Sequence, residues 1–290
     1  MNTPLPEKNA FADLHIHSNC SDGLLSPVEI VEYCRQIGLR TIAITDHDSV
    51  MSVDELKAVD HADVEIIPAV EMSSNIGPLD IHILAYYIDC DNADLLAYLG
   101  RLREHRIERA KKIVERLSRD GIKIDFERMQ ENAKHSAMGR PHIAEALREQ
   151  GYVQSIREAF VRFLSYHSPY YEPKMSVAPG DLLQKIRMWK GIPVIAHPGV
   201  YHDMDLVAQL VEDGASGIEV WHPEHSLACQ EELRDMASRE GLLMTGGSDC
   251  HGQRRSSLQI GKCGCGEPEL DRLRDYHNDH AHAAKRLRGE

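Results

Sequence analysis

The sequence predicts an α/β fold, and three of its features point that way. Short apolar runs rich in β-branched residues alternate with longer stretches of helical periodicity. The apolar runs are nearly continuous, as in parallel strands that are covered by helices on their faces. Polar groups directly follow several of these runs, where barrel enzymes hold their catalytic residues. The sequence therefore favours a barrel over a doubly wound sheet.

Seven short apolar runs are expected to form the strands. They are residues 11–15, 40–45, 64–70, 81–86, 192–196, 217–221 and 242–245. The polar residues that directly follow a run are Asp46, His47, Glu71, His197, His222 and Asp249. If the strands are parallel, these side chains share one edge of the fold.

The first helix is expected over residues 27–37, because both of its ends carry clear signals. Ser26 is an N-cap residue, Pro27 suits the first helical position, and Gly38 suits the residue after the last turn. Similar amphipathic patterns predict helices over 52–61, 180–190, 204–213 and 226–240.

The alternation of strands and helices breaks between about residues 93 and 165. Apolar residues from Leu95 to Leu117 have helical spacing, and further helical pattern follows at 141–150 and 155–164. We therefore predict a barrel in two parts, 11–92 and 168–266, separated by a helical insertion at 93–167. The polar tail, 267–290, is expected to be a surface helix or partly disordered.

Composition limits the function classes. The formal net charge of −13 opposes broad binding to long nucleic acids unless positive charge is locally concentrated. Neither a signal peptide nor a membrane-spanning stretch is evident, so we expect a soluble cytoplasmic protein with no membrane partner. The seven cysteines lack the paired spacing of a zinc ribbon, and we expect reduced thiols. The 17 histidines favour metal binding or proton transfer.

The strongest motif combines His15, His17 and Asp22. Alternate residues of a strand point the same way, so both histidines can face one ion. Asp22, on the loop that follows, offers an oxygen ligand for a neighbouring ion.

Further candidate ligands follow other strands, and Glu71 has two oxygens with which it could bridge two ions. Taken singly, each histidine could be an ordinary core or surface residue. Taken together, they favour a metal site, because similar groups recur at successive strand ends and an unpaired buried carboxylate is costly. The remaining candidates are His47, His82, His197, Asp249 and His251.

These motifs resemble those of the PHP (polymerase and histidinol phosphatase) family over residues 11–90 and 168–262. The motifs are His15-Ile16-His17, Thr45-Asp46-His47, Glu71, His82, His197 and Asp249-Cys250-His251. The resemblance implies a distorted (β/α)7 TIM-like barrel with three divalent ions, Mn²⁺ above all, with Fe²⁺ or Zn²⁺ as alternatives. The implied ligand sets are His15, His17, Glu71 and Asp249; Glu71, His82 and His197; and Asp22, His47 and His251. Asp46 is then expected to orient a ligand histidine.

Within the family, the chain resembles the branch that removes the 3′-phosphate from 3′,5′-bisphosphonucleotides, some members of which trim RNA from its 5′ end. The expected reaction is attack on phosphorus by a metal-bridging hydroxide. The leaving alcohol would be stabilised by a metal or protonated by a nearby acid, for which His222 and water are the candidates. Arg140, His142 and Lys174 are candidates for binding the second phosphate, and an ordinary surface position is the alternative for each.

Other functions stay open at this point. The same centre would serve a 5′–3′ exoribonuclease on short RNA, histidinol-phosphate phosphatase, or an amidohydrolase by barrel analogy. A metal-binding module without catalysis is disfavoured by the complete ligand set. The expected partner is a small phosphorylated nucleotide or a short RNA, and no obligate protein partner is evident.

One predicted helix is rich in basic residues: Arg101, Arg103, Arg106, Arg109, Lys111, Lys112, Arg116 and Arg119. It could follow a polynucleotide backbone, but a solvent-exposed face with Glu108/Lys112 and Glu115/Arg119 pairs is favoured. Cys20 and Cys250 are expected to be packing residues rather than nucleophiles. The tail histidines His277, His280 and His282 are given no role.

Overall fold

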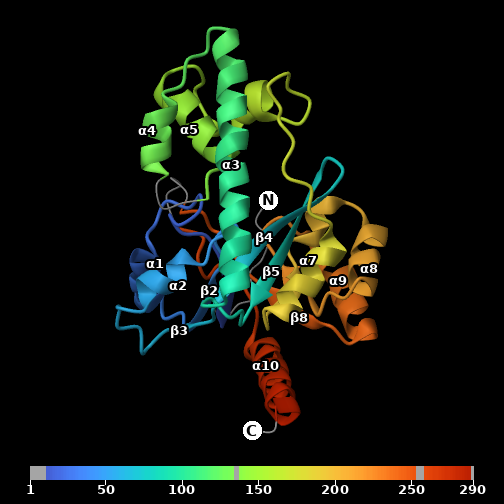
Figure 1. Cartoon of the computed structure of the whole chain (residues 1–290). Helices are drawn as coiled ribbons and strands as arrows, with labels where there is room; N and C mark the ends of the chain where they lie inside the picture. The colour runs from blue at the N-terminus through green and yellow to red at the C-terminus, as the bar shows by residue number, and fades with distance from the viewer. Residues whose placement is uncertain (1–10, 134–136, 253–257, 289–290) are drawn as a thin grey trace.

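The computed structural model describes residues 11–133, 137–252 and 258–288 and has a mixed α/β fold. The strands lie at the centre, helices flank them, a helical section lies at one end and a single helix projects from the other (Figure 1).

The described strands are assigned to two sheets. The first sheet is parallel throughout, in the order β1 (Ala12–Ile16), β2 (Thr41–Ile44) and β3 (Glu65–Ile66). The second sheet has the order β4 (Ala69–Ile76), β5 (Leu79–Tyr86), β6 (Ile192–Ile195), β7 (Gly217–Trp221) and β8 (Leu243–Gly246). Only β5 runs antiparallel to its neighbours in this second sheet.

The two sheets adjoin at both of their ends. At one seam, the Asp249 amide donates to the His15 carbonyl oxygen at 2.8 Å. At the other, the Asp48 amide donates to the Glu71 carbonyl oxygen at 2.9 Å. Both seams therefore lie among the predicted metal ligands. The sheets also share one apolar core, with Leu14 of β1 and Leu84 of β5 among its members.

Two expectations about the strands are wrong. Residues 64–70 form β3 and the start of β4, because Pro68 between them has no N–H for the ladder. β4 then continues to Ile76, so Glu71 lies within a strand and not after one. The expected parallel arrangement fails at β5, since the two residues between β4 and β5 allow only an antiparallel hairpin.

Helices cover the outer faces of the sheets. In α1 (Pro27–Ile37), the Ser26 side chain caps the first turn and Gly38 ends the helix with φ 73°, as predicted. The helix expected at 52–61 is shorter than predicted. The other flanking helices are α2 (Met51–Leu56), α7 (Pro179–Met188), α8 (Met204–Glu212) and α9 (Leu227–Glu240), with a 3₁₀ turn η2 (Pro198–Tyr201) after β6.

The helical section has an apolar core of its own, and α3 connects it to the sheets. Leu95 and Leu102 of α3 pack in the core of the five-stranded sheet, whereas Ile113 and Leu117 pack against the shorter helices. The section comprises α3 (Ala93–Arg119), α4 (Phe126–Asn132), α5 (Arg140–Glu149), α6 (Ile156–Ala159) and the π-helical turn η1 (Phe160–Leu164). The exact boundaries of 93–167 for an insertion stay a prediction.

The tail forms α10 (Glu267–Arg288), which projects from the body (Figure 1). Its first turns bury Leu270 and Leu273 in the core that the two sheets share. The tail is therefore helical, which is one of the two alternatives that the sequence left open. No helix among the described residues has the length and apolar character needed to cross a membrane.

Candidate metal centre

The two histidines of β1 point the same way, as their alternation predicts. Both are buried, and their Nε2 atoms lie 3.2 Å apart. Oε2 of Glu71 lies 3.4 Å from His15 Nε2 and 3.2 Å from His17 Nε2. Oδ1 of Asp249 lies 3.5 and 3.0 Å from the same two nitrogens. The structure therefore brings together the four side chains His15, His17, Glu71 and Asp249.

Glu71 directs its two oxygens at different histidines. Oε1 lies 2.9 Å from Nδ1 of His82 and 3.1 Å from Nε2 of His197. Oε2 faces β1 and also lies 2.9 Å from Nδ1 of His47. This arrangement suits a carboxylate that bridges two ions.

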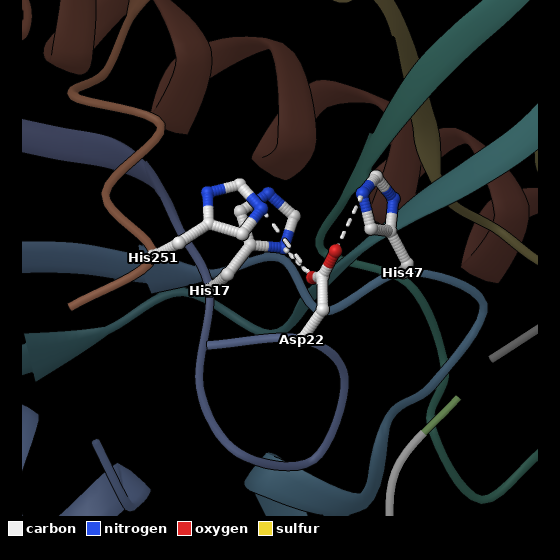
Figure 2. Close-up of side chains that lie close together, drawn as sticks. All are labelled: His17, Asp22, His47 and His251. Carbon is white, nitrogen blue, oxygen red and sulfur yellow. Dashed lines mark ion pairs between the residues drawn. The ribbon is translucent and has the colours of Figure 1, made fainter. Parts of the chain in front are cut away.

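A third group surrounds Asp22, as Figure 2 shows. Oδ1 of Asp22 lies 3.3 Å from Nε2 of His251, and Oδ2 lies 3.9 Å from Nε2 of His47. His17 joins this group through Nδ1, 3.9 Å from Oδ1. All nine predicted ligands thus converge, although His17 and His47 face more than one group.

The donor set fits divalent metal ions. Several buried side-chain atoms have no hydrogen-bond partner among the described residues, although buried polar atoms normally have one. Imidazole nitrogens together with carboxylate oxygens suit Zn²⁺, Mn²⁺ and Fe²⁺. The unpartnered atoms of the centre are Asp22 Oδ1, His47 Nδ1, Glu71 Oε2, His82 Nε2 and His197 Nδ1.

The electrostatics of the metal-free site favour ionised carboxylates beside several protonated imidazoles, whereas burial lowers the pKa of His82 to about 4 and keeps that ring neutral. Burial by itself raises the pKa of Glu71, but adjacent imidazoles, His47 and His82 foremost, hold it well below its usual range. For His251, burial lowers the pKa, yet the Asp22 carboxylate outweighs burial and raises it to about 10. A metal ion must therefore displace protons from this site.

Sequence reasoning missed Glu219, a fully buried residue within β7. Its Oε1 accepts a hydrogen bond from Nδ1 of His15 at 3.0 Å, and its Oε2 accepts one from the amide of His197 at 2.7 Å. With Nδ1 of His15 occupied in this way, Nε2 is left for a metal. The sequence does contain a sign of this role. Glu219 is a carboxylate inside an otherwise apolar strand, and a buried carboxylate needs a partner.

Asp46 contacts the serines beside the histidines of β1, and its role in orienting a ligand histidine stays a prediction. Its carboxylate accepts hydrogen bonds from the amide and hydroxyl of Ser18 at 2.8 and 2.7 Å, and from the hydroxyl of Ser21 at 2.7 Å. The described bonds of Asp46 include none to a histidine ring. The Ser21 hydroxyl is 3.5 Å from Nδ1 of His17, so the Asp46 carboxylate is linked to this ligand side chain through the serine.

His222 lies in the wall of the centre, 3 % exposed. Its Nδ1 accepts a hydrogen bond from the Glu224 amide at 3.2 Å, which leaves the proton on Nε2. Nε2 lies 3.3 Å from Oδ2 of Asp249. The role of His222 as an acid stays a prediction.

Two of the three predicted phosphate-binding residues share one carboxylate. Arg140 Nη2 and Lys174 Nζ lie 3.3 and 3.0 Å from Oδ2 of Asp80. Arg140 also donates to the Leu164 carbonyl oxygen at 3.0 Å. The third, His142, accepts a hydrogen bond from the Gly139 amide at 3.1 Å. None of the three is a loose surface side chain.

Sequence reasoning also missed Arg106 and Arg109, which it assigned to a solvent-exposed face. Arg106 donates to Asp48 at 2.8 Å and to the Ser73 hydroxyl at 2.7 Å. Arg109 donates through Nε to the Glu172 carbonyl oxygen at 2.7 Å, and its Nη2 is buried without a hydrogen-bond partner among the described residues. Arg106 and Arg109 line a small cavity together with Lys174.

The expected Glu108/Lys112 and Glu115/Arg119 pairs are absent from the described ion pairs. Lys112 and Arg116 pair with Glu172 instead, because the segment before α7 lies against this face of α3. Cys20 is buried, and burial raises the pKa of its thiol to about 12, which disfavours a nucleophilic thiolate. The packing role of Cys20 and Cys250 stays a prediction.

Comparison with known proteins identifies a family and several similar proteins. Residues 13–187 match the model of the PHP domain. The chain is 32% identical to the 3′,5′-nucleoside bisphosphate phosphatase of Chromobacterium violaceum, over 87% of this chain and 91% of that protein. It is 31% identical to the 5′-3′ exoribonuclease Rnm of Escherichia coli, over 82% and 84%. A solved structure from Bifidobacterium adolescentis, provisionally described as a metal-dependent phosphoesterase, superposes with a TM-score of 0.83 at 29% identity, over 93% and 96%.

Proposed function

The chain belongs to the PHP domain family, and on that premise we propose that it removes the 3′-phosphate from 3′,5′-bisphosphonucleotides. In broad terms, the chain is a metal-dependent phosphoesterase. The observation that carries the finer proposal is the likeness to a 3′,5′-nucleoside bisphosphate phosphatase along 91% of that protein's length.

The site offers two different environments for phosphate, which suits a substrate with two phosphates. One is the group of histidines and carboxylates around Glu71. The other is the cationic cluster, by which we mean Arg106, Arg109, Arg140 and Lys174. Guanidinium groups bind phosphate through paired hydrogen bonds, and a lysine adds a point charge.

The cationic cluster adjoins the candidate ligands along the chain and in space. Arg106 is bonded to Asp48, the residue after His47. Arg140 and Lys174 are paired with Asp80, two residues before His82 on β5. A 3′-phosphate at the histidines would therefore leave the 5′-phosphate within reach of the cationic cluster.

We propose that the nine ligands hold three divalent ions, with Mn²⁺ favoured over Fe²⁺ and Zn²⁺. When bound, such ions lower the pKa of water and neutralise phosphoryl oxygens. Glu219 orients His15, and the proton on Nε2 of His222 is available to the leaving 3′-oxygen. The shared core and the two seams support a single distorted barrel as the scaffold.

The test is phosphate release from adenosine 3′,5′-bisphosphate by the manganese-loaded protein. Histidinol phosphate and a short 5′-phosphorylated RNA serve as parallel substrates. We expect rapid release from the bisphosphate, with AMP as the other product, and no release after chelation. Turnover of another substrate with none of the bisphosphate would contradict the proposal.

A second candidate function is 5′–3′ exoribonuclease activity on short RNA. The likeness to Rnm favours it, as does a pocket at the far end of α3, which Lys111, Arg119 and Lys123 line together with Glu115 and Glu127. Exoribonuclease action would release mononucleotides from RNA, and it would weaken in an Arg119→Glu/Lys123→Glu variant. Hydrolysis of the bisphosphate needs no such pocket and would not change in that variant.

A further inference from the structure

The segment that leads from the helical section down to α7 (Figure 1) includes two tyrosines, Tyr166 and Tyr171, and the ring of Tyr171 lies beside Arg109 of the cationic cluster. The rings of Tyr166 and Tyr171 have centroids 4.9 Å apart and are inclined at 67° to each other. Tyr166 is 48% exposed, and Tyr171 is half-buried. We call these two residues the tyrosine pair.

The fold does not use the tyrosine pair as core. The apolar core of the helical section includes Phe163, and Tyr170 packs against it, but neither Tyr166 nor Tyr171 is among its described members. Two aromatic rings outside the core and open to solvent are available to a ligand.

The backbone at Tyr171 is nevertheless held firmly by α3. Arg116 donates to the Tyr171 carbonyl oxygen, and Arg109 donates to that of Glu172. The Arg109 guanidinium lies 5.7 Å from the centre of the Tyr171 ring. The ring is therefore positioned in advance, which lowers the entropic cost of binding a flat ligand to it.

The groups are arranged in a way that suits a 3′,5′-bisphosphonucleotide. Asp48, next to His47, binds Arg106, and Arg109 follows one helical turn along α3. The Tyr171 ring lies beyond Arg109. Moving away from the candidate ligands, one therefore meets cations and then aromatic rings. In a 3′,5′-bisphosphonucleotide the ribose carries both phosphates and the flat base, so a 5′-phosphate at the cations would bring the base near the rings.

We infer that the tyrosine pair is a stacking surface for the base of the substrate. The inference rests on the proposed function, because it presupposes a nucleotide at this site. Stacking tolerates any base, since every base has a π face. The pair would therefore distinguish nucleotides from plain sugar phosphates without selecting adenine.

The test compares the binding of AMP with that of ribose 5-phosphate to the metal-loaded protein by calorimetry. These probes differ by the base alone, and the measurement needs no turnover. We expect AMP to bind about 5- to 150-fold more tightly, the range that stacking on one aromatic side chain supplies. This preference should collapse in Tyr171→Leu and fall in Tyr166→Leu, whereas Tyr171→Phe keeps the ring and keeps the preference.

Tyr33→Leu, on α1, is the matched control and should keep the AMP preference of the natural protein. Equal affinity for both probes in the natural protein would overturn the inference. So would a Tyr171→Leu variant that is folded by circular dichroism and still prefers AMP. A protein that prefers AMP but releases no phosphate from the bisphosphate would retain the base site and lose the proposed reaction.

Discussion

Oε1 of Glu219 lies 3.0 Å from Nδ1 of His15, inside the core of the fold and not at its surface. The other oxygen of the same carboxylate accepts the amide of His197, whose backbone has the left-handed φ of 30°. One side chain of β7 therefore supports two predicted ligands, one within β1 and one just after β6. Non-glycine residues adopt such a conformation at a cost, and a fixed acceptor helps to hold it.

The first prediction concerns Glu219→Gln. Two donors face the two oxygens of Glu219, and glutamine has only one oxygen. If its amide group faces His15, the ring must carry its proton on Nε2, which blocks metal binding there. We expect metal affinity to fall by about 10- to 100-fold. Metal titration measures this loss, and histidine NMR of the Zn²⁺-loaded variant reports which His15 nitrogen carries the proton.

Glu172→Gln is a suitable control, because Glu172 pairs with Lys112 and Arg116 away from the candidate ligands. A Glu219→Gln protein with unchanged metal affinity and an unchanged His15 tautomer would show that Glu219 has no positioning role.

Much of the centre could be predicted because its ligands sit in short motifs. His15 and His17 depend only on the alternation of a strand, which sequence spacing reports directly. Glu219 could not be found in this way, since its partner His15 lies 204 residues away in the sequence. Arg106 was misassigned for a similar reason. Helical spacing gives the face on which a residue lies, but not which distant segment covers that face.

The strand order shows the same limit. Apolar runs identified where most strands lie, yet β5 reverses direction because the chain turns back after only two residues. Pro68 was visible in the sequence and should have marked the break between β3 and β4. Apolar residues on both sides of Pro68 suggested one continuous strand over residues 64–70.

The second prediction tests the ligand group around Asp22. In His47→Ala, one imidazole that faces both Asp22 and Glu71 is removed. We expect the metal content to fall by about one ion per chain. Activity should fall by at least about 10- to 100-fold. That is the loss typical of changing a residue that only supports a metal ligand, and His47 is predicted to be a ligand itself. Elemental analysis and phosphate release measure the two effects.

His61→Ala removes a histidine outside the centre and should change neither quantity. Full metal content together with full activity in His47→Ala would contradict the assignment of His47 as a ligand.

The third prediction concerns Arg109, whose Nη2 has no hydrogen-bond partner among the described residues. In Arg109→Leu, we expect KM for adenosine 3′,5′-bisphosphate to rise about 10- to 100-fold, the loss of one charge-assisted hydrogen bond to the second phosphate. KM for p-nitrophenyl phosphate should not change, because that substrate has one phosphate. Equal effects on both substrates would mean that Arg109 supports the fold or the centre, and not the second phosphate.

The fourth prediction follows from the pKa of His251, which Asp22 raises to about 10 against the effect of burial in the metal-free protein. A group whose pKa is raised on folding stabilises the fold below its unfolded pKa of about 6.5. That contribution is lost as the pH rises through about 10. The thermal stability of the metal-free protein should therefore decline between pH 7 and pH 10.

The same proton opposes metal binding, so the two effects of pH have opposite signs. Manganese must displace the proton from His251, and metal affinity should therefore increase over the pH range in which metal-free stability declines. Adding Mn²⁺ at pH 7 in weak buffer should release protons, and His251→Asn should release fewer. Calorimetry in buffers of different ionisation enthalpy counts these protons. Metal binding without proton release at pH 7 would mean that the imidazole of His251 is already neutral or does not bind the ion.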